Sequence, residues 1–194
     1  MPETAKNKVR LTIKNAHVAT LTVGEDGAIT YDTPVPVPGT VNLDLAAVGE
    51  LTKFYADGIV YWQGETNNGY EGDWESAGFP ESLETEIWPN KKVQTDNVHI
   101  ENANLTGKSF ALLFEIVGDV SARKYCLYNC TAKRTNVGGA TSGENKEPQT
   151  VSATISAIPL PNGDVKAVTC ADTTEDVINN WYKKVYQPDA TPAA

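Results

Sequence analysis

Apolar and polar residues alternate along several short stretches of the chain, and this feature constrains the fold most strongly. The clearest stretches are residues 9–13, 17–23, 41–45, 70–76 and 151–158. A period of two residues is typical of half-buried β-strands. Turn residues separate the stretches and long helices do not alternate with them, which excludes a doubly wound parallel sheet. We therefore predict a mainly β fold, an antiparallel β-sandwich or half-barrel.

The most apolar run lies in the second half of the chain. Residues 110–117 read FALLFEIV, and their length and aromatic content favour a central strand. Residues 122–133 are expected to run back beside it. A tight turn at residues 161–163 predicts that residues 165–169 pair with the strand at 151–158.

Two short amphipathic helices are expected to lie on the strands. The first spans residues 80–87, where Pro80 suits the first turn and an apolar stripe is formed by Phe79, Leu83 and Ile87. The second, at the C-terminus, follows a sequence at 173–176 that resembles a capping box. Its apolar stripe is formed by Val177, Trp181 and Val185. Each helix is predicted to bury its stripe.

The chain is predicted to hold one domain, at residues 9–186. Residues 1–8 and 187–194 are expected to be flexible ends. Two loops, at residues 46–57 and 135–148, are longer than a compact domain usually needs. The first contains three large apolar residues, Leu51, Phe54 and Tyr55, which in a loop require a partner to cover them.

Composition excludes several classes of function. The net charge is −9 and the pI is about 4.7, which disfavours tight, sequence-independent binding of nucleic acid. Neither a signal peptide nor a membrane span is recognisable. Cys126 and Cys130 would lie about 13 Å apart along one strand, too far for a disulfide with each other. We expect them to be free thiols on one face of that strand.

No catalytic, cofactor-binding or metal-binding pattern is present, so an enzyme is not predicted. The two histidines, His17 and His99, stand alone in the sequence and are expected to be structural. The alternating acids Glu71, Asp73 and Glu75 have three interpretations. They are a solvated sheet face, a functional anionic wall, or paired catalytic carboxylates of the glycosidase type.

The aromatic residues of the same region allow a different interpretation. Tyr61, Trp62, Tyr70 and Trp74 are capable of presenting flat rings to a sugar. In alternating strands, however, such rings more often fill the core. We expect Tyr70 and Trp74 to lie in the core beneath the helix at residues 80–87.

Five segments in order resemble a known family. They are FYADGIVYW with NNGYEGDWESAGFPES, FALLFEIVGD, YNCTAKR, EPQTVSATISAIP and NNWYKKVY. Together they resemble the major tail proteins of long-tailed, non-contractile bacteriophages, the phi13-type group. The resemblance covers residues 9–186, and the chain departs from the family pattern at residues 88–107.

The resemblance implies a tail tube subunit that works by self-assembly. Such subunits form rings, typically hexameric, that stack into a hollow tube in the virion after assembly in the bacterial cytoplasm. The implied partners are other copies of the chain, the tape-measure protein, the tail terminator and tip proteins, and double-stranded DNA in transit, with no membrane. No cofactor is implied.

Two sets of residues are candidates for this function. Glu71, Asp73 and Glu75 are predicted to face the lumen, where negative charge repels DNA phosphates. Leu51, Phe54 and Tyr55 are predicted to contact the neighbouring ring. Two alternatives remain open: a carbohydrate-binding module for host adhesion, and the inner tube protein of a contractile tail or tailocin.

Overall fold

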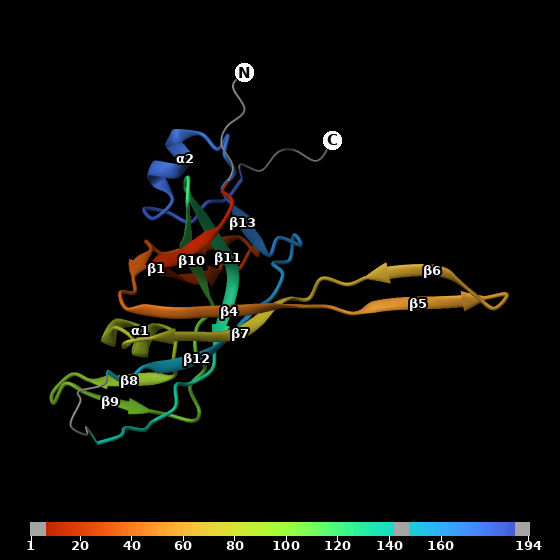
Figure 1. Cartoon of the computed structure of the whole chain (residues 1–194). Helices are drawn as coiled ribbons and strands as arrows, with labels where there is room; N and C mark the ends of the chain where they lie inside the picture. The colour runs from red at the N-terminus through yellow and green to blue at the C-terminus, as the bar shows by residue number, and fades with distance from the viewer. Residues whose placement is uncertain (1–6, 142–147, 189–194) are drawn as a thin grey trace.

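The computed structural model describes residues 7–141 and 148–188, and its body is one strongly curled antiparallel sheet (Figure 1). Within these residues nine strands join in the sheet, in the order β2-β1-β10-β11-β12-β7-β4, with β3 pairing to β1 and β13 to β11. The strands are β1 (Arg10–Val23), β2 (Ile29–Tyr31), β3 (Val35–Pro36), β4 (Thr40–Val48), β7 (Gly69–Ser76), β10 (Phe110–Gly118), β11 (Ala122–Ala132), β12 (Val151–Ala157) and β13 (Lys166–Val168). The predicted mainly β, antiparallel fold is confirmed.

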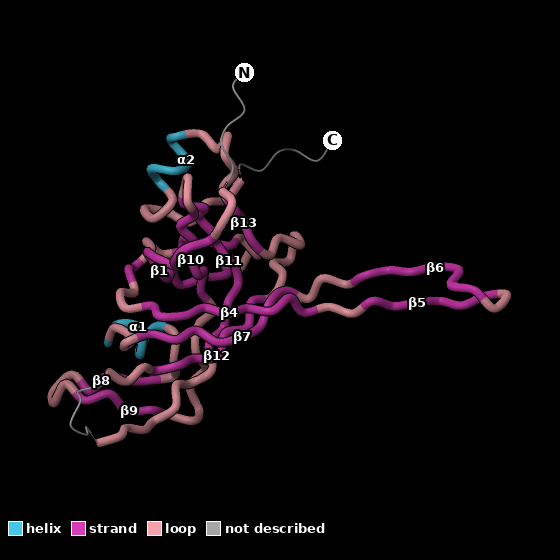
Figure 2. Tube along the Cα trace, in the orientation of Figure 1, coloured by secondary structure: helices cyan, strands magenta, loops and turns pink. Residues whose placement is uncertain are grey.

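Two hairpins and two short helices complete the structure (Figure 2). The hairpins are β5 (Leu51–Ala56) with β6 (Ile59–Glu65), and β8 (Asn90–Val93) with β9 (Val98–Glu101). The helices are α1 (Glu81–Glu86) and α2 (Glu175–Asn180). Both helices were predicted from the sequence, and both are shorter than expected. None of the helices in the described residues is long and apolar enough to cross a membrane.

The sheet curls around a first hydrophobic core, as a half-barrel does. Strands β1 and β4 contact each other across the opening. Helix α1 covers this core with Leu83, and Ile87 directly after the helix joins it, as the apolar stripe predicted. Trp74 of β7 is 1% exposed, and its ring meets that of Phe79 edge to face with 5.0 Å between centroids. The expectation that Trp74 is a core residue beneath α1 is confirmed.

A second core lies on the opposite face of β10 and β11. It is covered by the C-terminal segment, which contributes Trp181 and Val185. Leu112 of β10 faces the first core and Leu113 faces the second, and both are fully buried. Because both faces of β10 are buried, its sequence is apolar throughout rather than alternating.

The predicted placement of the two strand thiols is wrong in one respect. Both are free and buried, but Cys126 belongs to the second core and Cys130 to the first. The register between β10 and β11 shifts between Phe110 and Leu112, and this irregularity reverses the alternation of faces along β11. Burial raises the pKa of both thiols, which keeps them protonated and inert.

Three further predictions about local structure are corrected. Strand β13 pairs with β11 and not with β12, since both edges of β12 are occupied by β11 and β7. Helix α2 has no side-chain cap. The hydroxyl of Thr173 instead accepts a hydrogen bond from the backbone N–H of Cys170, at 2.8 Å. The predicted loop at residues 46–57 consists mainly of the end of β4 and of β5.

The remaining expectations concern the ends and the second loop. Residues 1–6 and 189–194 of the predicted flexible ends lie outside the described residues, as do 142–147 of the predicted loop at 135–148. Asn7 is held by the turn after β10, where its Nδ2 donates to the carbonyl oxygen of Ser121 at 2.7 Å. This contact places the start of the described chain beside the β10–β11 turn.

Candidate functional site

The β5–β6 hairpin projects from the body as a long arm (Figure 1). It extends the paired strands β4 and β7, because β5 follows β4 after two residues and β6 precedes β7. The cross-strand pairs run from Leu51 opposite Glu65 to Ala56 opposite Ile59. Asp57 and Gly58 form the tip with φ values of 52° and 78°, as a two-residue hairpin turn of the Asp-Gly type requires.

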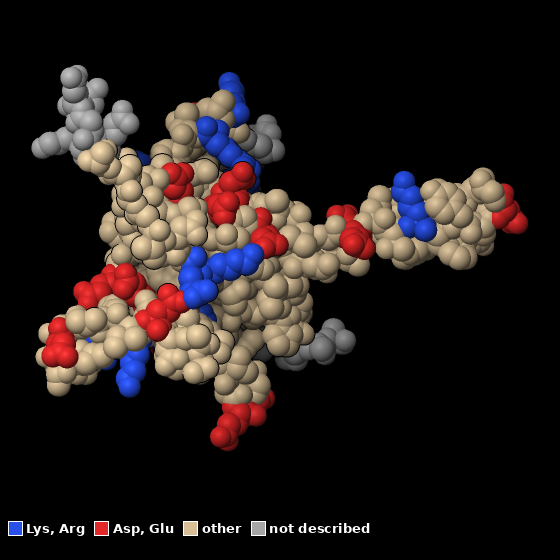
Figure 3. All heavy atoms as spheres, turned by 90° about the horizontal axis from the view of Figure 1, so that it is seen from below, with Lys and Arg blue, Asp and Glu red and all other residues tan. Residues whose placement is uncertain are grey.

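Large apolar side chains lie exposed on both faces of this arm. Phe54 pairs with Trp62 on one face, and their exposed fractions are 57% and 56%. Tyr55 pairs with Val60 on the other face, and both are also exposed. Tyr61 is the extra residue at a register shift and is the most exposed of the large apolar residues of the arm, at 70%. Figure 3 shows that most of the arm's surface on the face in view carries no charge.

The arm lacks the support that a strand pair normally needs. It forms a separate two-stranded sheet, so in the described part of the chain neither outer edge is paired. A lone two-stranded ribbon is only marginally stable in water. Exposed apolar patches with free edges mark surfaces that associate with a partner. The arm is therefore the strongest candidate for a binding surface on this molecule.

The structure places the predicted contact residues on this arm. Leu51, Phe54 and Tyr55 all lie in β5 and are exposed, although in a strand and not in a loop. The sequence interpretation missed Ile59 and Trp62 of β6 as parts of the same surface. The Asp-Gly pair at the tip is the signal that would have joined the two segments.

The three predicted acidic residues lie together on the solvent face of β7. Glu71, Asp73 and Glu75 point away from the first core, whereas Trp74 points into it. Strand β4 places Asp44 opposite Asp73, an acidic neighbour that the sequence interpretation missed. The face is therefore more acidic than predicted.

The surroundings of these carboxylates are polar. On the other side of β7, strand β12 contributes Ser152, Thr154 and Ser156. The hydroxyl of Thr154 donates to the Asp73 Oδ1 at 3.0 Å, and the hydroxyl of Thr150 donates to Glu75. The face is thus a hydroxyl-rich and anionic surface, with Lys133 Nζ 3.7 Å from Glu71 at its margin.

The sugar-platform interpretation named four rings, and the structure separates them. Trp74 is buried, and the ring of Tyr70 is covered by the ammonium of Lys166, 4.4 Å from the ring centroid. Tyr61 and Trp62 lie on the arm. The four-ring platform is therefore wrong, because β7 directs its aromatic residues to the core and its acids to the solvent.

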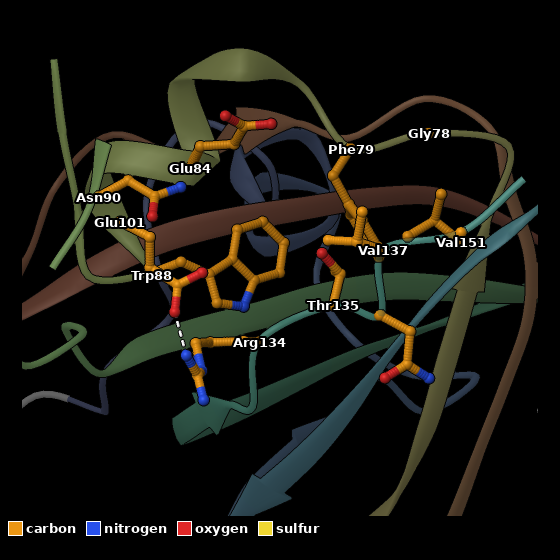
Figure 4. A pocket seen from close by; sticks show the side chains of 12 residues that line it. Gly78, Phe79, Glu84, Trp88, Asn90, Glu101, Arg134, Thr135, Val137 and Val151 are labelled. Atoms are coloured by element: carbon orange, nitrogen blue, oxygen red, sulfur yellow. Dashed lines mark hydrogen bonds and ion pairs between the residues drawn. The ribbon is translucent and has the colours of Figure 1, made fainter. Parts of the chain in front are cut away.

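A surface cleft of about 480 Å³ opens between α1, the β8–β9 hairpin and the segment after β11 (Figure 4). The ion pair between Arg134 and Glu101 spans its rim, and the Trp88 Nε1 donates to the carbonyl oxygen of Lys133 at 2.9 Å. These contacts fix the hairpin and the segment to the body. No group of three metal-ligand side chains lies close enough to hold an ion in the part of the chain that the structure describes.

His99 performs a structural task beside this cleft. Its Nδ1 lies 2.8 Å from a carboxylate oxygen of Glu84, and its Nε2 lies 3.3 Å from one of Glu81. These contacts join β9 to α1. His17 stacks on Tyr182, with 4.5 Å between the ring centroids. His99 thus contacts α1, and His17 contacts the C-terminal segment.

A buried polar cluster fastens the C-terminal segment. Glu115 accepts hydrogen bonds from the Lys124 Nζ and the Asn15 Nδ2, each at 2.8 Å, and from the Tyr182 hydroxyl at 3.2 Å. Burial acts to raise the pKa of the Glu115 carboxyl, but Lys124, Tyr182 and Asn15 outweigh it, so the pKa lies below its ordinary value. The carboxylate remains ionised and holds β1, β10, β11 and the C-terminal segment together.

Comparison with known proteins gives only distant likenesses. No family model matches the chain, and neither does any curated protein. A sheath/tube terminator of an extracellular contractile injection system (PVC) is 10% identical, with a TM-score of 0.41, and 84% of this chain and 99% of that chain are covered. A chain of the PVC sheath-tube complex is also 10% identical with a TM-score of 0.41, over 80% of this chain and 88% of that one. The tube-terminating cap of the anti-feeding prophage is 12% identical with a TM-score of 0.40, over 87% and 99%. Likenesses this distant do not assign a function.

Proposed function

We propose that the chain is a structural subunit that assembles with copies of itself into the tube of a phage-like tail. The observation that carries this proposal is the β5–β6 arm, which exposes aromatic side chains on both faces. Phe54 and Trp62 on one face and Tyr55 on the other remain uncovered in a single copy. Covering them by association supplies the hydrophobic free energy that the isolated ribbon lacks.

The free edges of the sheet favour other copies as the partner. Strand β4 is at the end of the strand order, so the outer edge of Thr40–Val48 has no pairing strand among the described residues. That edge leads directly into β5 of the arm. A long unprotected edge is a template for pairing with another chain. An arm that contacts a different surface of the next copy makes a head-to-tail contact, and such contacts generate closed rings or helical tubes.

The acidic face of β7 supplies a suitable wall for the channel. In this proposal Glu71, Asp73 and Glu75, together with Asp44, line the lumen. Carboxylates there repel the phosphates of DNA, so the duplex passes without adhering. The net charge of −9 has the same sign. The hydroxyls of β12 keep the wall polar and hydrated.

The finer assignment rests on the sequence resemblance to major tail proteins. It comprises hexameric rings, a non-contractile tail, a tape-measure protein inside the tube, terminator and tip proteins at its ends, and ejection of DNA. The inner tube of a contractile tail uses the same assembly chemistry. Binding of a sheath protein to the assembled tube distinguishes the two.

Electron microscopy of the purified protein tests the proposal. We expect rings or tubes in negative stain, and their loss in the double variant Phe54→Ser with Trp62→Ser, which removes the apolar pair from one face of the arm. Val137→Ser changes a fully exposed apolar residue away from the arm and is the control. A protein that stays monomeric across concentration and salt contradicts the proposal.

A further inference from the structure

A second surface with an unusual composition lies far from the arm. It is a cleft of about 250 Å³ formed by the start of β1, the end of β10 and the start of β11. Its lining residues are Asn7, Lys8, Val9, Arg10, Ile116, Gly118, Arg123 and Tyr125. Three cationic side chains therefore meet at one cleft of a chain whose net charge is −9.

These three cations have little internal compensation. None of Lys8, Arg10 and Arg123 forms an ion pair with a carboxylate of the described residues. The Arg123 Nε donates to the carbonyl oxygen of Thr169 at 3.3 Å, which orients the guanidinium. Asp119 is the acidic residue nearby, and its Oδ1 accepts from the backbone N–H of Lys8 at 2.8 Å. The cleft keeps a net positive charge.

The cleft also contains apolar side chains and lies beside an exposed thiol. Val9 is half exposed at its mouth, while Ile116 and Tyr125 are partly buried in its wall. An adjoining cleft of about 350 Å³ shares Asn7 and Arg123 with it and is lined in addition by the exposed Cys170. A ligand with one carboxylate beside apolar side chains would match this combination.

The tip of the arm carries one carboxylate beside apolar side chains. Asp57 stands at the turn and is exposed, and its side chain makes no ion pair with the described residues. Tyr55 and Ile59, both exposed, lie on either side of it. Figure 1 shows the arm extending sideways from β4 and β7, away from the start of β1. The tip therefore reaches such a cleft only on another molecule.

We propose that the arm tip of one copy docks in the cationic cleft of a second copy. Asp57 meets Arg10 and Arg123, and Tyr55 or Ile59 covers Val9. This inference rests on the proposed self-assembly and names the surface that receives the arm. Because the tip and the cleft are different surfaces of one chain, the contact is head to tail and propagates from copy to copy.

Charge reversal tests the contact. Asp57→Lys, and separately Arg10→Glu with Arg123→Glu, are each expected to raise the concentration at which half of the protein assembles by about tenfold or more, because each leaves like charges facing one another. The chain that carries all three substitutions is expected to recover assembly. Sedimentation velocity and negative-stain images give the readout, and circular dichroism establishes that each variant is folded.

Matched controls change equal charges elsewhere. Glu25→Lys alters an exposed acid in the turn between β1 and β2, and Lys183→Glu with Lys184→Glu alters two exposed cations after α2. Both controls are expected to assemble as the wild type does. As an independent readout, Ile59→Cys is expected to cross-link to the native Cys170 of another copy, and the cross-link is expected to disappear when Cys170→Ser is added.

The outcomes separate the two proposals. A wild-type protein that never assembles refutes the proposed function itself. A wild type that assembles while Asp57→Lys and the cleft variant assemble equally well overturns the docking inference alone. Loss of assembly without recovery in the triple variant, together with absence of the cross-link, also overturns it.

Discussion

The buried carboxylate of Glu115 permits the most quantitative prediction. The side chains of Glu115 and Lys124 are 10% and 15% exposed, and their charged atoms are 2.8 Å apart. Glu115→Ala removes the acceptor shared by Lys124, Asn15 and Tyr182. Removing one partner of a buried ion pair costs about 3–5 kcal/mol, mostly because the other charge remains buried and uncompensated.

The lower end of this range applies here, since neither group is completely buried. We expect Glu115→Ala to lower the free energy of unfolding by about 3 kcal/mol. Glu71→Ala is the matched control. Glu71 and Lys133 are 3.7 Å apart with side chains 49% and 73% exposed, and such a pair contributes less than about 1 kcal/mol.

The pH dependence gives a second readout of the same cluster. Although burial opposes it, the folded-state pKa of Glu115 lies below its ordinary value of 4.5. A carboxyl whose pKa is lower in the folded state contributes stability above its unfolded pKa, and that contribution is lost as pH falls through the folded pKa. Glu115→Gln is therefore expected to lose less stability than the wild type when the pH falls below about 4.5.

Urea denaturation followed by tryptophan fluorescence and circular dichroism measures both effects. The decisive comparison is Glu115→Ala against Glu71→Ala at neutral pH, followed by Glu115→Gln against the wild type in acid. A loss below about 1 kcal/mol for Glu115→Ala, no larger than that of an exposed pair, would refute the reasoning.

Three further predictions test other parts of the structure. Gly72→Ala places a Cβ 1.9 Å from the carbonyl oxygen of Asp44, so it should lower the free energy of unfolding, measured in urea, by at least about 1–3 kcal/mol. Gly138→Ala is the control and should leave that free energy unchanged, because no atom lies within 4 Å of the added Cβ. Trp74→Ala removes a buried ring and should lower the free energy of unfolding by about 3–5 kcal/mol in the same assay. Trp62→Ala removes an exposed ring and should change the free energy of unfolding of the single copy by less than about 1 kcal/mol. Changing Glu71, Asp73 and Glu75 together to lysine should leave tubes intact in electron micrographs but slow DNA ejection, and unchanged ejection would remove them from the lumen wall.

Strand β7 shows how much the sequence predicted. Its alternation separated Trp74, which is buried, from Glu71 and Asp73, which face the solvent. The rule succeeded because one face of β7 packs on the core of the same chain. The apolar stripe of α1 was predicted for the same reason. Apolar periodicity that arises from burial within one chain can be recognised in its sequence.

The arm shows where this reasoning fails. Phe54 and Tyr55 are adjacent apolar residues on opposite faces of β5, so the segment has no alternation and its pattern predicts a loop. None of the residues that the structure describes buries either face. Under the proposed self-assembly, these residues pack against another copy, so their pattern does not follow burial within one chain. The edge pairing of β13 was missed for a related reason, because pairing between distant strands leaves no local pattern.

One image of the assembled protein tests the central claim most directly. Cryo-electron microscopy of concentrated protein should show rings or tubes in which the β5–β6 arm lies against another copy and the acidic face of β7 lines the channel. A particle in which the arm remains uncovered, or a protein that shows only single copies under every condition of concentration and salt, would contradict the account.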